Sequence, residues 1–362
     1  MNLQEYNSYI KKIKSLNYDK QDHWDVFGDL FFNKMSSFES MSTFRTNGIS
    51  NMLETGLPSQ ERENALKGKH YDTQYSLHEI EDIKKRFFEL QVMLEEDINE
   101  IPFNSKVGDP RCYNHIIDGK KYSLNFDDLY HVYSAWQIKR TISFLGRQKI
   151  NNILEIGAGY GNLAQKLTSI YPGVKYIIID LPEVLLIQHY FLSQNNPNCK
   201  IENLLNYEEI PYKNVNEIDC DVVLVPFNKY KEIKINFDLA INTRSFGEMP
   251  KNVLNDYVSW VQKNINHKGL LYTTNRYVFT KSKDKNKIRD YPFDNFWEPI
   301  LTQPQWLQTH LHEFMLQRAP GRTAFPLSFR LRSFPISTPP PGPIMQSIQT
   351  QEEWLKHQKE KK

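Results

Sequence analysis

The chain has 362 residues, of which 40% are hydrophobic and 24% are charged, and its formal net charge is +2. This length allows one large domain or two ordinary ones, with a sizeable buried core. The nearly neutral charge argues against a protein whose whole surface binds nucleic acid. The three cysteines form no C-x-x-C pair, which argues against a structural zinc site and against a disulfide framework.

Targeting signals and membrane spans are not expected from the sequence. The first 20 residues contain no apolar core of signal-peptide length. No window approaches the ~18 uninterrupted apolar residues that a membrane helix needs. Cysteines without a pairing pattern are typical of a reducing compartment. We therefore expect a cytoplasmic protein without a membrane span.

Residues 1–128 are expected to form a mainly helical region that covers the substrate. Its clearest helix spans about 77–98, where apolar residues recur every three or four positions and so share one helix face. Asp-Gly at 118–119 and other turn residues indicate that 101–128 is a turn-rich connection. A further helix is expected over 129–147.

From about residue 150, short apolar runs alternate with helical segments. Such an alternation is typical of a parallel sheet covered on both faces. The sequence therefore predicts a doubly wound, Rossmann-like α/β domain over residues 129–334, followed by a Pro-rich and polar tail over 335–362. The expected strands are 151–157, 175–180, 220–226, 237–242 and 269–275, and the expected helices are 162–171, 182–194 and 250–264.

A glycine-rich turn follows the first of these strands directly, in the pattern Glu155-x-Gly157-x-Gly159-x-Gly161. Glycines let the backbone approach a ligand closely, and a strand-to-helix turn aims its N–H groups at that ligand. A dinucleotide-binding turn has the pattern G-x-G-x-x-G. Here the third glycine comes one residue early, which favours S-adenosylmethionine over a dinucleotide.

Asp180 ends the second strand, where a carboxylate can accept hydrogen bonds from both ribose hydroxyls. Dinucleotide enzymes use the same arrangement, so Asp180 indicates a nucleotide-like cofactor without distinguishing the two. Phe227, after the third strand, can pack on the adenine ring, with a core position as the alternative. The residues expected to bind the cofactor are Glu155, Gly157, Ala158, Gly159, Tyr160, Gly161, Asp180, Leu181, Phe227 and Asn242.

Polar residues follow the fourth and fifth strands, whose carboxyl ends face the acceptor in this fold. Glu248 is the carboxylate best placed to act as a general base for an alcohol or to orient a sugar hydroxyl. Its alternative place is the first turn of the next helix, where a carboxylate favourably meets the helix dipole. Arg244, Ser245, Asn275 and Arg276 are expected to bind the substrate. No histidine stands out as a base, and no residues have the spacing of metal ligands.

Five segments carry a family resemblance: LEIGAGYGNLAQKL, IIIDLPEVLLIQHYFL, FDLAINTRSFGEM, LYTTNRY and DYPFDNFW. Over about residues 105–318 the chain resembles the bacterial sugar O-methyltransferases, which are class I methyltransferases. The resemblance implies that Glu155 anchors the glycine turn and interacts with the amino group of the methionine moiety. DLPEVL is also similar to phenol and indole O-methyltransferases, which use a histidine base after the fifth strand. This chain has Asn275, Arg276 and Tyr277 there.

The resemblance implies an O-methyltransferase that transfers a methyl group from S-adenosyl-L-methionine to a hydroxyl of a sugar or nucleotide-linked sugar. A small-molecule methyltransferase acting on a phenol or an amine is one alternative, and a non-catalytic scaffold that binds S-adenosylmethionine is another. A nucleic-acid methyltransferase is disfavoured by the charge. We expect no metal, a small-molecule or nucleotide-sugar acceptor as the partner, and no nucleic acid; the sequence also allows a homodimer.

Overall fold

The computed structural model describes residues 1–16, 31–35, 37–46, 74–103, 105–117, 119–147, 149–211, 214–279, 284–319 and 321. The chain forms two compact units. The first comprises residues 1–242 and 264–269, and the second comprises 243–263 and those from 270 onward. The predicted tail over 335–362 lies outside the described residues. The domain boundaries expected at residues 128 and 334 stay predictions.

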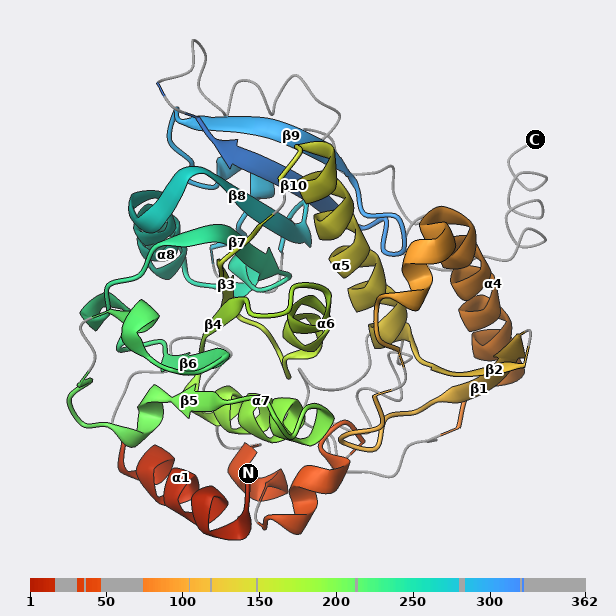
Figure 1. Ribbon diagram of the computed structural model, residues 1–362, viewed down its shortest axis with the longest axis horizontal. Helices are drawn as coiled ribbons and strands as arrows, with labels where there is room; N and C mark the ends of the chain where they lie inside the picture. The colour runs from red at the N-terminus through yellow and green to blue at the C-terminus, as the bar shows by residue number, and fades with distance from the viewer. Residues whose placement is uncertain are drawn as a thin grey trace. The chain divides into compact units, whose positions relative to one another are not determined.

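The first unit is built around five parallel strands, shown in Figure 1. Adjacent strands follow the order β5-β6-β4-β3-β7. Ile153, Ile177 and Val223, on three neighbouring strands, have no exposed surface. Buried apolar runs of this kind are what a sheet covered on both faces requires. The strands are β3, Asn152–Ile156; β4, Lys175–Asp180; β5, Ile201–Asn203; β6, Val222–Pro226; and β7, Phe237–Thr243.

The helices of the first unit are α1, Leu3–Ser15; α4, Leu77–Leu94; α5, Phe126–Phe144; α6, Asn162–Ile170; and α7, Pro182–Asn195. Capping boxes satisfy free N–H groups at two helix starts, through Asn2 and Glu5 in α1 and through Ser76 and Glu79 in α4. Helix α1 lies along α7 (Figure 1). Short 3-10 helices span Glu39–Thr43, Glu95–Asn99, Leu204–Asn206, Val215–Glu217 and Tyr230–Glu232.

A β-hairpin occupies residues 113–124 of the turn-rich connection predicted over 101–128. Strands β1, Tyr113–Ile117, and β2, Lys120–Leu124, pair antiparallel, and Gly119 in their turn has a φ of 75°. Gly119 therefore belongs to a hairpin turn, where a positive φ favours glycine. The two strands are hard to recognise in sequence because one of them has no buried residue. Tyr122 packs against Phe87 of α4, with ring centroids 4.8 Å apart.

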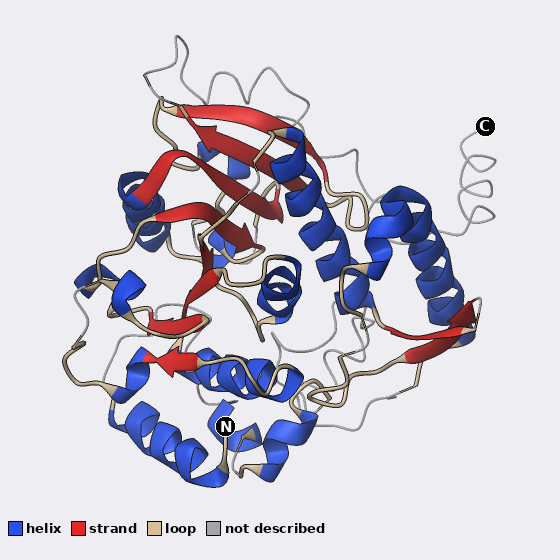
Figure 2. Cartoon of the chain, in the orientation of Figure 1, coloured by secondary structure: helices blue, strands red, loops and turns tan. Residues whose placement is uncertain are grey.

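The second unit contains three antiparallel strands in the order β8-β10-β9, drawn in red in Figure 2. The strands are β8, Ile265–Arg276; β9, Trp297–Pro304; and β10, Leu311–Arg318, and the helix is α8, Lys251–Asn264. Phe246–Glu248 and Ile288–Asp290 are 3-10 helices. The sequence does not predict β9 or β10, whose buried Glu313 accepts hydrogen bonds from Tyr272 at 2.9 Å and Gln303 at 2.7 Å.

The strand and helix assignments confirm the predicted α/β fold with a mostly parallel sheet and a helical N-terminal region. The predicted strands after residue 150 correspond to β3, β4, β6, β7 and β8. In the part of the chain that the structure describes, no helix has both the length and the apolar character needed to cross a membrane.

Candidate cofactor and acceptor sites

The turn between β3 and α6 contains three glycines in the left-handed region, with φ angles of 71° at Gly157, 58° at Gly159 and 92° at Gly161. Residues with a Cβ rarely adopt these angles. The Gly157 N–H donates to the Ile179 carbonyl at 3.0 Å, which ties the turn to β4. A Cβ added at Gly159 would meet no atom within 4 Å among the described residues, apart from those of its chain neighbours. Gly159 therefore leaves open space beside the backbone, as close approach of a ligand requires.

Gly159→Ala is expected to weaken binding of S-adenosylhomocysteine, the reaction product, by about tenfold, because the methyl group enters that space. Gly173→Ala is the matched control, since Gly173 also has a positive φ of 80° and no atom within 4 Å of an added Cβ. Both variants carry similar backbone strain. Calorimetric measurement of S-adenosylhomocysteine binding by the two variants should therefore separate the effect of backbone strain from the loss of space for the ligand. Equal affinities for both variants would contradict this role of Gly159.

Glu155 on β3 is fully buried, and its Oε2 accepts a hydrogen bond from the Tyr176 hydroxyl at 2.6 Å. Its Oε1 is buried without a hydrogen-bond partner among the described residues. Burial raises the pKa of Glu155 to about 8, in spite of the hydrogen bond from Tyr176, and the charge of Asp180 raises it further. An unpartnered carboxyl oxygen in this position fits a cationic ligand group, such as the ammonium of a methionine moiety.

Glu155→Gln is expected to stabilise the ligand-free protein at pH 7 by about 3 kcal/mol, while weakening product binding about tenfold. The folded-state pKa of about 8 lies above the ordinary 4.5, so the folded protein holds this proton more tightly than the unfolded chain does. Its stability contribution is therefore lost as the pH rises from about 4.5 to about 8. Glutamine still accepts from Tyr176 but does not ionise. Thermal unfolding between pH 5 and 8 tests this, and an unchanged pH slope would contradict it.

Asp180 ends β4, and its two carboxylate oxygens already accept hydrogen bonds from the protein. Oδ1 accepts from the Leu181 N–H at 2.8 Å, and Oδ2 accepts from the Gln188 amide at 2.8 Å. Burial raises the pKa of Asp180 to about 7, although these hydrogen bonds oppose the rise. Each carboxylate oxygen can accept more than one hydrogen bond, so the group keeps capacity for ligand hydroxyls.

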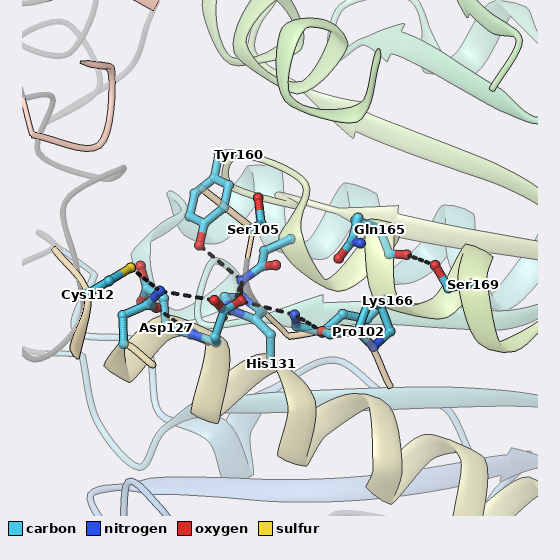
Figure 3. A network of polar contacts seen from close by, with 12 residues as sticks. Pro102, Ser105, Cys112, Asp127, His131, Tyr160, Gln165, Lys166 and Ser169 are labelled. Atoms are coloured by element: carbon cyan, nitrogen blue, oxygen red, sulfur yellow. Dashed lines mark hydrogen bonds and ion pairs between the residues drawn. The ribbon is translucent and has the colours of Figure 1, made fainter. Parts of the chain in front are cut away.

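Tyr160 and Asn162 connect the glycine turn to a buried polar network, shown in Figure 3. Asn162 Nδ2 donates to the Tyr160 hydroxyl at 3.0 Å and to Asp128 at 3.1 Å. Lys166 donates to Asp128 at 3.0 Å. Burial alone raises the pKa of Asp128, but the charges of Lys166 and Arg45 outweigh it and lower that pKa. The Arg45 guanidinium also lies 4.7 Å from the centre of the Tyr160 ring.

The remaining predicted cofactor residues lie around the same strand ends. Asn242 at the end of β7 is fully buried and donates to the Ile156 carbonyl at 2.9 Å. The Phe227 N–H donates to the Asp180 carbonyl at 2.9 Å. Ala158 is buried within the glycine turn, and Leu181 caps α7. The structure thus brings all ten predicted cofactor residues to the carboxyl ends of β3, β4, β6 and β7.

The predicted acceptor residues belong mainly to the second unit, after β7 and at the end of β8. Arg244 has a φ of 67°, which is unusual for a residue with a side chain. Its N–H donates to the Thr274 carbonyl at 2.6 Å. Burial lowers the pKa of Arg276, the charge of Glu248 opposes this shift and the charge of Arg244 adds to it, so both groups lie within electrostatic range of Arg276. Two guanidiniums and a carboxylate are suited to an anionic, hydroxyl-bearing ligand.

Glu248 lies in the 3-10 helix Phe246–Glu248 and is half-buried. Helix α8 begins at Lys251 and has no acidic residue in its first turn, so the alternative place for Glu248 in that turn is wrong. Asn275 is fully buried, with Oδ1 accepting from the Gly247 N–H at 3.1 Å and Nδ2 donating to Thr273 at 2.8 Å. Its observed contacts therefore position the loop that carries Glu248. Ser245 is buried beside it.

His312 on β10 is a buried histidine with partners for both ring nitrogens. His312 is 2% exposed; its Nε2 lies 2.8 Å from Thr302 Oγ1, and its Nδ1 lies 3.1 Å from the Tyr277 hydroxyl. Burial lowers the pKa of His312 to about 3, so its ring is neutral at physiological pH. Among the described residues, no three His, Cys, Asp or Glu side chains are grouped so that they could hold a metal ion.

Residues 87–204, about a third of the chain, match the model of an O-methyltransferase domain. This match supports the predicted O-methyltransferase reaction class and, with it, the predicted cofactor S-adenosylmethionine; it leaves the predicted domain bounds untested. It covers the glycine turn, Asp180 and α7. It does not reach β7 or β8, and so it does not bear on the predicted acceptor residues. No curated protein matches the chain in sequence.

Several solved structures are similar to this chain in part. The match to the pyocyanin biosynthetic protein PhzM has 13% identity and a TM-score of 0.33, covering 47% of this chain and 50% of that one. For the mitomycin 7-O-methyltransferase MmcR the values are 9% and 0.33, with coverage of 53% and 57%. For a methyltransferase from Pyrococcus furiosus they are 11% and 0.35, with coverage of 65% and 98%. The chain thus spans about half the length of the first two.

Proposed function

We propose that this protein transfers a methyl group from S-adenosylmethionine to a hydroxyl of a sugar or nucleotide-linked sugar. The observation that carries the donor half is the pairing of the open space at Gly159 with two carboxyls at adjacent strand ends, the fully buried Glu155 and the half-buried Asp180. The family-model match to an O-methyltransferase domain supports the reaction class.

The chain's own residues divide the work of binding the donor. Glu155 offers its unpartnered oxygen to the methionine ammonium, and Asp180 accepts from the ribose hydroxyls. The glycine turn admits the ligand close to the backbone N–H groups at the start of α6. When bound, S-adenosylmethionine supplies an electrophilic methyl group.

The acceptor half rests on Glu248, Arg244 and Arg276. Glu248 would accept the proton of the acceptor hydroxyl, and the oxygen of that hydroxyl would take the methyl group that bound S-adenosylmethionine supplies. The products are a methyl ether and S-adenosylhomocysteine. Two neighbouring guanidiniums repel each other, and an anion between them relieves this repulsion. A nucleotide-linked sugar, with its diphosphate, provides such an anion. Ser245 and Asn275 complete the proposed substrate set.

The test is an incubation with labelled S-adenosylmethionine and a panel of nucleotide sugars, free sugars, phenols and amines. Label transferred to a nucleotide sugar or sugar supports the proposal. Label transferred to phenols or amines only would select the small-molecule alternative. If the protein binds S-adenosylhomocysteine but transfers label to no compound of the panel, the non-catalytic scaffold is selected. The cytoplasmic location and the homodimer stay predictions, which fractionation and light scattering test.

A further inference from the structure

Gln188 lies on the second turn of α7 and has no exposed surface. Its side-chain amide reaches two separate parts of the cofactor site. Nε2 donates to the Gly159 carbonyl at 2.8 Å and to Asp180 Oδ2 at 2.8 Å. An amide NH2 has two N–H donors, so one group can serve both acceptors.

The two hydrogen-bond acceptors of Gln188 are central parts of the proposed cofactor site. Gly159 is the central glycine of the turn, where the backbone leaves open space, and Asp180 is the carboxylate that ends the next strand. The turn and the strand end are joined to each other by the Gly157–Ile179 backbone hydrogen bond at 3.0 Å. Gln188 adds a side-chain connection on the helix side.

We propose that Gln188 is a positioning residue for the cofactor, which holds the Gly159 carbonyl and the Asp180 carboxylate in one geometry before the ligand binds. The proposal rests on the proposed cofactor site. Rigid placement of binding groups lowers the cost of ordering them when the ligand arrives. Gln188 acts through Asp180 and the turn, without a role in the chemical step.

The carbonyl oxygen of the Gln188 amide also supports a role beyond filling the core. Gln188 Oε1 is buried and has no hydrogen-bond partner among the described residues. A buried amide kept only for packing has both ends paired or is replaced by an apolar side chain at little cost. The contacts that Gln188 makes all come from the two N–H groups of its side-chain amide.

The charges around Asp180 give the proposal a pH signature. The charge of the fully buried Glu183 on α7 raises the pKa of Asp180, and Glu155 on β3 and Asp180 each disfavour the ionised form of the other. The hydrogen bond from Gln188 favours the ionised form. Without that donor, the pKa of Asp180 rises above about 7.

The experiment replaces Gln188 with methionine, which has a similar size and no donor. At pH 7 we expect Gln188→Met to bind S-adenosylhomocysteine about tenfold more weakly in calorimetry. The pH at which binding reaches half its maximum should also shift upward. Gln194→Met is the matched control, because Gln194 is exposed on the same helix, and it should change neither quantity.

A second comparison separates positioning from a general structural role. If Gln188 acts through Asp180, adding Gln188→Met to Asp180→Asn should weaken binding by about twofold or less, because neighbouring residues of one network are not additive. A full tenfold further loss would overturn the proposal. Should Gln188→Met fail to fold, Gln188→Asn keeps the amide but is one methylene too short, and it should show the same loss and pH shift.

The outcomes also distinguish this proposal from the function on which it rests. Wild-type protein that does not bind S-adenosylhomocysteine contradicts the proposed function. Wild-type protein that binds, together with a Gln188→Met variant of equal affinity and unchanged pH profile, overturns the role of Gln188 alone.

Discussion

Replacing Glu248 with glutamine should lower kcat for methyl transfer by about 100-fold or more, the usual contribution of a positioned general base. Glutamine keeps the shape of the side chain and removes its ability to take the hydroxyl proton. The structure places Glu248 in the 3-10 helix before α8, within electrostatic range of Arg276. Initial rates at saturating donor and acceptor measure the effect.

Affinity for the donor provides the internal control for Glu248→Gln. The dissociation constant of S-adenosylhomocysteine should stay within about twofold of wild type, because Glu248 has no proposed role in donor binding. Glu232→Gln, at an exposed position, is a control with no expected effect on rate. A Glu248→Gln enzyme with wild-type kcat would show that the base is another group or that none is needed.

Removing the carboxylate of Asp180 should have the second-largest effect, a loss of about 100-fold in affinity for S-adenosylhomocysteine. Two hydrogen bonds from ribose hydroxyls to a charged acceptor account for a loss of this size. Asp180→Ala also leaves the Gln188 amide without one of its acceptors. Calorimetry at pH 8, where the wild-type carboxylate is ionised, measures the difference.

The same residue predicts how binding depends on pH. The pKa of Asp180 is raised by burial from its ordinary 3.8 to about 7, so the group is protonated below about pH 7. Only the ionised form accepts from both hydroxyls. Affinity should therefore increase as the pH rises through about 7, and the ionisation of Glu155, whose pKa is about 8, should add to the increase above that pH. Asp180→Asn should remove the part of the increase that is centred near pH 7, and a wild-type profile that is flat from pH 6 to 8 would contradict this role of Asp180.

Much of the fold could be predicted because its strong signals are local. The strand of Ile153, the glycine turn and the amphipathic helix of Phe87 follow from short-range periodicity and turn chemistry. The β1–β2 hairpin could not, because β1 has no buried residue and so lacks the apolar pattern of a strand. Strands β9 and β10 could not, because β10 joins the sheet beside β8, a partner distant in sequence. Glu313 is an example, since a charged residue in a buried strand becomes reasonable only once Tyr272 and Gln303 are seen to pair with it.

The sequence predicts the backbone of the cofactor site better than it predicts the side chains that contact this backbone. Gly159 and Asp180 follow from the motif, whereas Gln188 is eight residues beyond Asp180 on a helix and carries no motif. One available signal was Tyr176, a polar residue in an otherwise apolar strand, which pairs with Glu155. For Asn275, polarity alone suggested ligand contact, and the structure shows its amide engaged by Gly247 and Thr273.

The central claim is that the glycine turn and Asp180 bind S-adenosylmethionine and not a dinucleotide. Calorimetric titration of the wild-type protein with S-adenosylhomocysteine and, separately, with NAD tests it most directly. The account predicts binding of S-adenosylhomocysteine with a dissociation constant of about tens of micromolar or lower and no measurable binding of NAD. Binding of NAD with no binding of S-adenosylhomocysteine would contradict it.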